Sequence, residues 1–166
     1  RQSPAEQFSE LLAALLSLDR EIGIIFTLPN ADNNGRALIR MIGEFVENAG
    51  SERATAHASL GHLRYLSVLA NVDALVGNSS SALTEAPSFQ KPAVNIGDRQ
   101  KGRLRAASVI DCPPHRDDIR AAIEKALELD CAGITNPYGS GDSASRMATV
   151  LRTVALDDLR QKHFLL

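Results

Sequence analysis

The spacing of apolar residues along the chain changes repeatedly between that of a buried strand and that of an amphipathic helix. Short apolar or β-branched runs predict strands, whereas apolar residues three or four positions apart predict helices. The predicted strands cover residues 22–28, 53–57, 74–76, 93–96 and 108–111. The predicted helices cover residues 4–16, 38–50, 60–69, a segment from a serine run to about residue 89, 117–129 and 143–154. The first helix begins at a capping box in which Ser3 precedes Pro4 and Glu6.

Strand and helix alternate about five times in this order. Such alternation indicates a parallel sheet with helices on both faces, because a parallel strand needs a crossover connection before it. The length of 166 residues is enough for one domain with a substantial core. The sequence therefore predicts an α/β protein built on a single Rossmann-like, doubly wound parallel sheet.

The composition narrows the range of functions. Hydrophobic residues make up 44% of the chain and charged residues 23%, as in an ordinary globular domain. The formal net charge of −2 indicates neither a nucleic-acid partner nor a membrane surface, and no apolar run approaches the ~20 residues of a membrane span. The two cysteines, Cys112 and Cys131, lack the spacing of a metal site, so we expect no metal and a reduced, cytoplasmic protein.

The most informative segment follows the strand at 74–76. Three consecutive serines, Ser79, Ser80 and Ser81, stand at the predicted start of a helix. Backbone N–H groups at a helix start lack intrahelical acceptors and, with the helix dipole, favour a phosphate or carboxylate. Glu85 lies one turn past Ser81, where its carboxylate is suited to accept hydrogen bonds from the hydroxyls of a ribose. The same pattern also fits an ordinary serine cap with no ligand.

Three further polar loops follow predicted strands. They cover residues 29–30, 59–61 and 97–105, and the last of them is rich in arginine and lysine. Ligands of open parallel sheets bind at the carboxyl ends of the strands, which is where all these loops are expected to lie. Amides, hydroxyls and cations at one sheet edge favour an anion site over a bare helix cap.

Four segments together carry a resemblance to a known family. Residues 78–89 read Asn-Ser-Ser-Ser-Ala-Leu-Thr-Glu-Ala-Pro-Ser-Phe, and residues 94–103 read Val-Asn-Ile-Gly-Asp-Arg-Gln-Lys-Gly-Arg. Residues 28–32 read Leu-Pro-Asn-Ala-Asp, and residues 136–139 read Asn-Pro-Tyr-Gly. In this order they resemble the UDP-N-acetylglucosamine 2-epimerases, and more closely the hydrolysing branch that releases N-acetylmannosamine for sialic-acid synthesis.

The resemblance implies a glycosyltransferase-B architecture of two Rossmann-like domains, of which residues 1–166 would be the C-terminal, UDP-binding one, with the N-terminal domain absent. It implies a UDP-sugar as substrate and no cofactor. It places Ser79, Ser80 and Ser81 at the diphosphate and Glu85 at the ribose. The remaining UDP-binding candidates that it implies are the Leu60 backbone near the uracil, Asn30 and Arg99 at the phosphates or the sugar, and Arg103.

The chain departs from the family pattern at a few positions. Ala82 stands where the family usually has glycine, and Ser140-Gly141 follow the Asn-Pro-Tyr-Gly segment where Asp-Gly is usual. The family's catalytic carboxylates and an active-site histidine belong to segments that precede the matched ones. The resemblance therefore implies no catalytic residue in this chain, inactivity of the chain alone, and a homo-oligomer in the full-length form.

Several alternatives remain open on the sequence. Within the family these are a non-hydrolysing UDP-N-acetylglucosamine 2-epimerase and a hydrolysing enzyme that acts on UDP-diacetylbacillosamine. Outside the family they are the donor domain of a glycosyltransferase and a non-enzymatic nucleotide-binding module.

Overall fold

The computed structural model describes residues 2–29 and 35–155. Helices and strands alternate through most of this length, and the paired strands are all parallel, so the predicted α/β class is confirmed. The elements are α1 (Pro4–Leu16), β1 (Ile24–Thr27), α2 (Gly35–Ala49), β2 (Ala54–His57), α3 (Gly61–Asn71), β3 (Leu75–Gly77), α4 (Ser81–Thr84), the 3-10 helix η1 (Ala86–Phe89), β4 (Ala93–Ile96), β5 (Val109–Cys112), α5 (Arg116–Glu128) and α6 (Ser143–Thr153).

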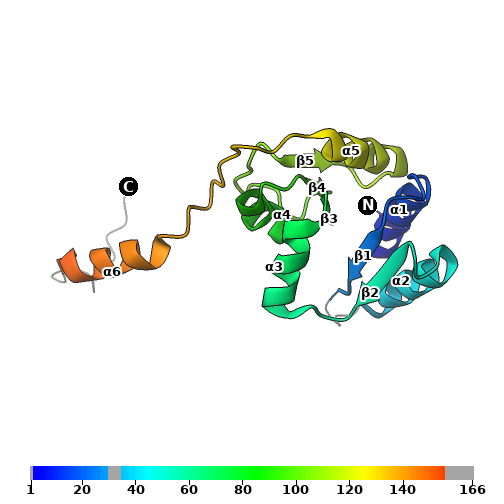
Figure 1. Ribbon diagram of the computed structural model, residues 1–166, viewed down its shortest axis with the longest axis horizontal. Helices are drawn as coiled ribbons and strands as arrows, with labels where there is room; N and C mark the ends of the chain where they lie inside the picture. Colours follow the sequence, from blue (N-terminus) through cyan, green and yellow to red (C-terminus); the bar gives the residue numbers. More distant parts are fainter. Residues whose placement is uncertain (1, 30–34, 156–166) are drawn as a thin grey trace.

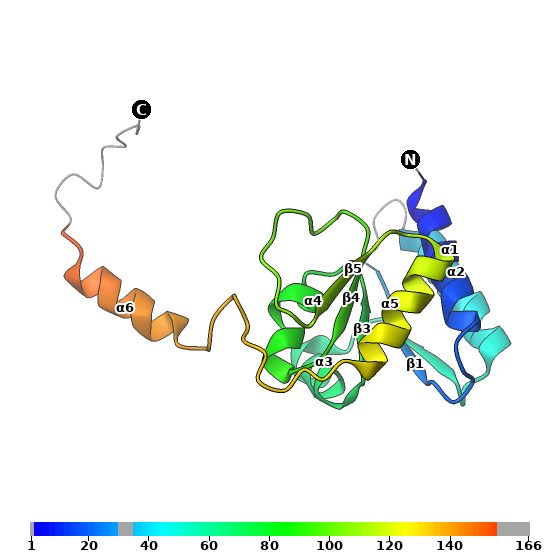
Figure 2. The ribbon, with the colours of Figure 1, turned by 90° about the horizontal axis from the view of Figure 1, so that it is seen from above.

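Hydrogen bonding divides the described strands into two groups (Figure 2). β1 pairs with β2, and β4 lies between β3 and β5. The sequence predicted a single continuous sheet. Within the described residues the strands form a pair and a trio instead, and no ladder joins β1 to β3.

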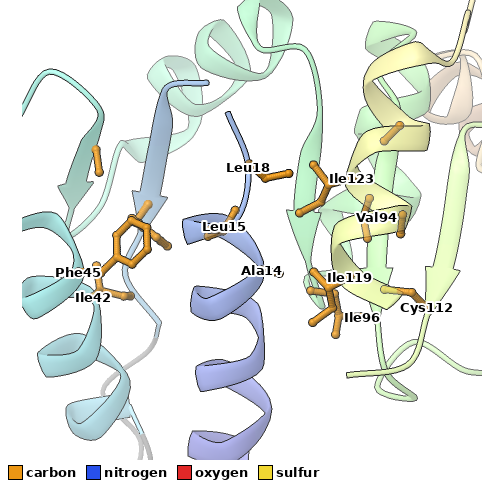
Figure 3. Close-up of a cluster of buried hydrophobic side chains, with 14 residues drawn as sticks. Ala14, Leu15, Leu18, Ile42, Phe45, Val94, Ile96, Cys112, Ile119 and Ile123 are labelled. Carbon is orange, nitrogen blue, oxygen red and sulfur yellow. The ribbon is translucent and has the colours of Figure 1, made fainter. Parts of the chain in front are cut away.

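One hydrophobic cluster nevertheless joins the two groups. Its buried side chains come from α1, α2, α5 and from strands of both groups. In Figure 3, Leu15 and Leu18 lie between Phe45 of α2 and the side chains of β4 and α5. Phe45 packs edge-on against Phe26 of β1, with ring centroids 5.4 Å apart. The same core thus holds both groups of strands in place.

A second cluster covers the other face of the three-stranded group. It contains Leu69 of α3, Leu83 of α4 and Ala93 of β4. Ala93 belongs to this cluster and its neighbour Val94 to the first, because successive side chains of a strand point to opposite faces. The trio is therefore covered on both sides, as a buried parallel sheet requires.

The helix predicted to run from the serines to residue 89 is broken. α4 ends at Thr84, and η1 begins at Ala86 with Pro87 in its first turn. Proline has no N–H to donate and its ring collides with the preceding turn, so an α-helix does not continue through it.

The predicted capping box at the first helix is confirmed, since the Ser3 side chain and the Glu6 side chain each bond the other's backbone.

α6 stands apart from the rest of the structure at the end of an extended connection (Figure 1). None of its residues is buried, and Met147, Val150 and Leu151 are exposed along it. Within the described part of the chain, no helix is both long and apolar enough to cross a membrane.

Leu69 and Leu63 provide a matched test of the packing of α3. Both lie on this helix, but Leu69 is 2% exposed and Leu63 is 82% exposed. Leu69→Ala should lower the free energy of unfolding by about 2–5 kcal/mol, because it removes buried apolar atoms and leaves a cavity. Leu63→Ala should change it by less than about 0.5 kcal/mol. Chemical denaturation followed by circular dichroism measures both, and equal losses would contradict this packing.

Candidate functional site

The serine segment lies where the sequence places it, directly after β3. Ser79 and Ser80 are exposed, whereas Ser81 is buried as the first residue of α4. The backbone N–H groups of Ser79 and Ser80 have no hydrogen-bond partner among the described residues. These two N–H groups and the two exposed hydroxyls can therefore bind an anion. α4 has four residues, so its dipole adds little to this capacity.

Glu85 is held by Ser81, as their spacing of one helical turn predicts. The Ser81 hydroxyl donates to Glu85 Oε2 at 2.5 Å, and the Tyr65 hydroxyl of α3 bonds the same Ser81 oxygen. Burial is the main cause that raises the pKa of the Tyr65 phenol; the bond with Ser81 lowers it, and the charge of Glu85 raises it. Tyr65 is therefore protonated at neutral pH. No sequence motif indicated Tyr65 as a site residue.

The basic loop after β4 is attached to the serine segment. Gln100 Nε2 donates to the Asn78 carbonyl at 2.7 Å, and Arg99 Nη1 donates to Asn78 Oδ1 at 3.4 Å. Gln100 is 4% exposed, so its amide fixes the loop from inside, while Arg99 stays exposed beside the serines. The structure thus brings together Arg99 and the serine run, as the sequence predicts.

A second arginine of the same loop has a structural role. Arg105 Nε forms an ion pair with Asp111 Oδ2 at 2.7 Å, and Asp111 Oδ1 accepts from the buried Asn95 amide at 2.6 Å. Arg105 also donates to the Arg103 carbonyl at 2.8 Å. Arg103 itself is exposed, and no contact of its side chain with the serine segment is present among the described residues. Its assignment to UDP binding stays a prediction.

Leu60 lies in a hollow beyond the ends of β1 and β2. The hollow has a volume of about 590 Å³ and includes Leu28, Ser59, Leu60 and Tyr65 in its lining. Tyr65 therefore belongs both to this hollow and, through Ser81, to the Glu85 site. Asn30, the remaining candidate, lies outside the described residues.

The Asn-Pro-Tyr-Gly segment fastens the end of α4 to the rest of the chain. Asn136 Nδ2 donates to the Thr84 carbonyl at 2.9 Å and to Ser88 Oγ at 2.6 Å. The Tyr138 hydroxyl donates to the Leu104 carbonyl at 3.2 Å. This segment therefore supports the elements that carry Glu85 and the basic loop.

The site contains hydrogen-bond donors, one arginine and one bonded carboxylate. Among the residues that the structure describes, no group of three or more His, Cys, Asp or Glu side chains is arranged to hold a metal ion.

Burial, with smaller contributions from Asp118 and Asp111, raises the pKa of Cys112 to about 11, so this thiol is a poor nucleophile at neutral pH.

Polar loops at the carboxyl ends of parallel strands occupy the usual ligand-binding position of an open α/β fold. The sequence profile of the UDP-N-acetylglucosamine 2-epimerase family matches residues 1–152. The chain belongs to this family, as the sequence motifs indicated.

Curated relatives support the same assignment. The chain is 39% identical over 118 residues, 70% of its length, to the GDP/UDP-N,N'-diacetylbacillosamine 2-epimerase (hydrolyzing) of Campylobacter jejuni. It is 33% identical over 150 residues, 90% of its length, to the UDP-N,N'-diacetylbacillosamine 2-epimerase (hydrolyzing) of Legionella pneumophila. These matches span 30% and 38% of the two relatives, so the chain corresponds to about a third of their length.

Solved structures share the fold. The UDP-GlcNAc 2-epimerase of Methanocaldococcus jannaschii, solved with UDP-GlcNAc and UDP, matches with a TM-score of 0.71 at 16% identity. The match covers 89% of this chain and 41% of that one. The fold of the chain is therefore that of part of a glycosyltransferase-B-like epimerase.

Proposed function

We propose that this chain is the UDP-binding part of a hydrolysing 2-epimerase that converts UDP-N-acetylglucosamine and water to N-acetylmannosamine and UDP. One observation supports this most strongly: Ser79, Ser80, Glu85 and Arg99 lie around the ends of two adjacent strands in a chain that belongs to the epimerase family. The hydrolysing outcome is favoured by the names of the two bacterial relatives described above.

The exposed serines and Arg99 form the diphosphate site in this proposal. Ser79 and Ser80 each offer a backbone N–H without a partner among the described residues, and Arg99 offers the cation. Charge-assisted bonds of this kind stabilise a phosphate strongly, and they stabilise the negative charge that develops on UDP as it leaves.

Glu85 binds the ribose in the same proposal. Its Oε2 accepts from Ser81, and its Oε1 has no partner among the described residues. A carboxylate oxygen in this state can accept hydrogen bonds from vicinal hydroxyls. The hollow beside Leu60 then receives the uracil, because its lining of Leu28, Leu60 and Tyr65 offers apolar surface at the correct end of the strands.

The chemistry on the sugar needs groups besides these. Removal of the proton at carbon 2 requires a positioned base, and the described site holds donors and a carboxylate already bonded to Ser81. We therefore propose that the 166-residue chain binds UDP and is inactive alone.

UDP-N,N'-diacetylbacillosamine is the second candidate substrate, since the names of two relatives include it.

Replacement of Glu85 tests the ribose site. Glu85→Ala should weaken UDP binding by about 1.5–3 kcal/mol, the usual contribution of hydrogen bonds to a charged group. Binding of 2′,3′-dideoxy-UDP should change little, because that ligand lacks the hydroxyls. Isothermal titration calorimetry measures both, with Glu124→Ala as the control, since Glu124 pairs with Arg120 on α5. Equal weakening of the two ligands would show that Glu85 does not contact the ribose.

Turnover by the isolated chain tests whether this chain is inactive alone. Incubation of the 166-residue protein with UDP-N-acetylglucosamine should release no N-acetylmannosamine above a buffer blank, because every group assigned to the site binds UDP and none of them serves as the base at carbon 2. Coupled detection of N-acetylmannosamine and UDP gives the answer. Clear release of both products would contradict inactivity of the chain alone.

A further inference from the structure

The hydrogen bonds around Ser81 have a fixed direction. A serine hydroxyl carries one proton, and an ionised carboxylate only accepts. Because the Ser81 proton goes to Glu85, the bond between Ser81 and Tyr65 must be donated by the Tyr65 hydroxyl. The Tyr65 phenol therefore donates to Ser81, and Ser81 donates to the Glu85 carboxylate.

This direction changes what Ser81 can do for a nucleotide. Its proton is committed to Glu85, and its side chain is buried, with the residue 8% exposed. Ser79 and Ser80, in contrast, are exposed and have backbone N–H groups without partners among the described residues. The three serines thus differ: Ser79 and Ser80 are exposed to solvent, and Ser81 bonds Glu85.

Tyr65 is well placed to hold this arrangement. Its ring packs against the cluster that contains Leu69 of α3 and Leu83 of α4, so apolar contacts set the position of its hydroxyl. The hydroxyl bonds Ser81, the first residue of α4. The same ring lines the hollow proposed for the base.

We propose that Tyr65 and Ser81 are positioning residues of the ribose site, which hold Glu85 Oε2 so that Oε1 is presented to the ribose hydroxyls. This inference rests on the proposed function, since it requires a ribose at Glu85. It assigns Ser81 to Glu85 instead of the diphosphate, and it adds Tyr65, which carries no role in the family motifs of the sequence.

The test compares UDP with 2′,3′-dideoxy-UDP by calorimetry in three variants of the full chain. Tyr65→Phe should weaken UDP binding about fivefold, the usual effect of one lost hydrogen bond, and leave the dideoxy ligand unchanged. Ser81→Ala should weaken UDP at least as much, with the same selectivity. The double variant should resemble Ser81→Ala alone, because Tyr65 acts through Ser81.

Ser67→Ala is the control for loss of a hydroxyl on α3, since Ser67 is exposed and lies two residues from Tyr65. It should leave both affinities unchanged. Thermal unfolding of each variant separates loss of binding from loss of fold, and the ratio of the two ligand affinities is insensitive to partial unfolding.

Each other outcome overturns a specific claim. If Ser81→Ala weakened the binding of both ligands equally, Ser81 would contact the diphosphate and not position Glu85. If Tyr65→Phe kept full UDP affinity, or if the two substitutions acted independently in the double variant, Tyr65 would not position Glu85. The proposed function would still stand. Failure of the unmodified chain to bind UDP would overturn the proposed function and this inference together.

Discussion

The parallel pairing of β3 with β4 is the constraint on which the candidate site depends. Gly77, the last residue of β3, lies opposite Asn95 of β4, so the serine segment and the basic loop leave the sheet side by side. Gln100 and Arg99 then both reach Asn78. Two segments about twenty positions apart in sequence form one surface because their strands end at the same edge.

Buried polar groups hold this surface in shape. Asn95 donates to Asp111 from a position with 0% exposure, and Asp111 in turn pairs with Arg105 of the basic loop. Such bonds stabilise modestly on average, but leaving a buried partner unpaired is costly. The loop is therefore fixed from β4 and β5 at one end and from Asn78 at the other, which leaves Arg99 exposed beside the serines.

Much of this could be predicted from the sequence. β4 covers the predicted residues, and the contact between Ser81 and Glu85 follows from their spacing. The break between α4 and η1 could also have been predicted from the sequence, since Pro87 ends a helix. The contact of Tyr65 with Ser81 could not be predicted, because periodicity places Tyr65 on a helix face without showing which element that face meets.

Long-range contacts are likewise absent from local patterns. Asn136 meets Thr84 from 52 positions away, and no spacing rule indicates such a pair. The division of the strands into a pair and a trio depends on which edges meet, which propensity does not encode. The family of the chain follows from its match to the family profile, whereas the proposed roles of individual residues at the site rest on the contacts described above.

Amide chemical shifts in a UDP titration show whether UDP binds at the ends of β3 and β4. In a titration of the isotopically labelled 166-residue protein, we expect saturable shifts at residues 78–85, 97–100 and 59–65. We expect no shifts around Cys131, which lines a separate hollow with Lys91 and Asp130. Saturable shifts confined to that second hollow, or no shifts at millimolar UDP, would contradict a UDP site at the ends of β3 and β4.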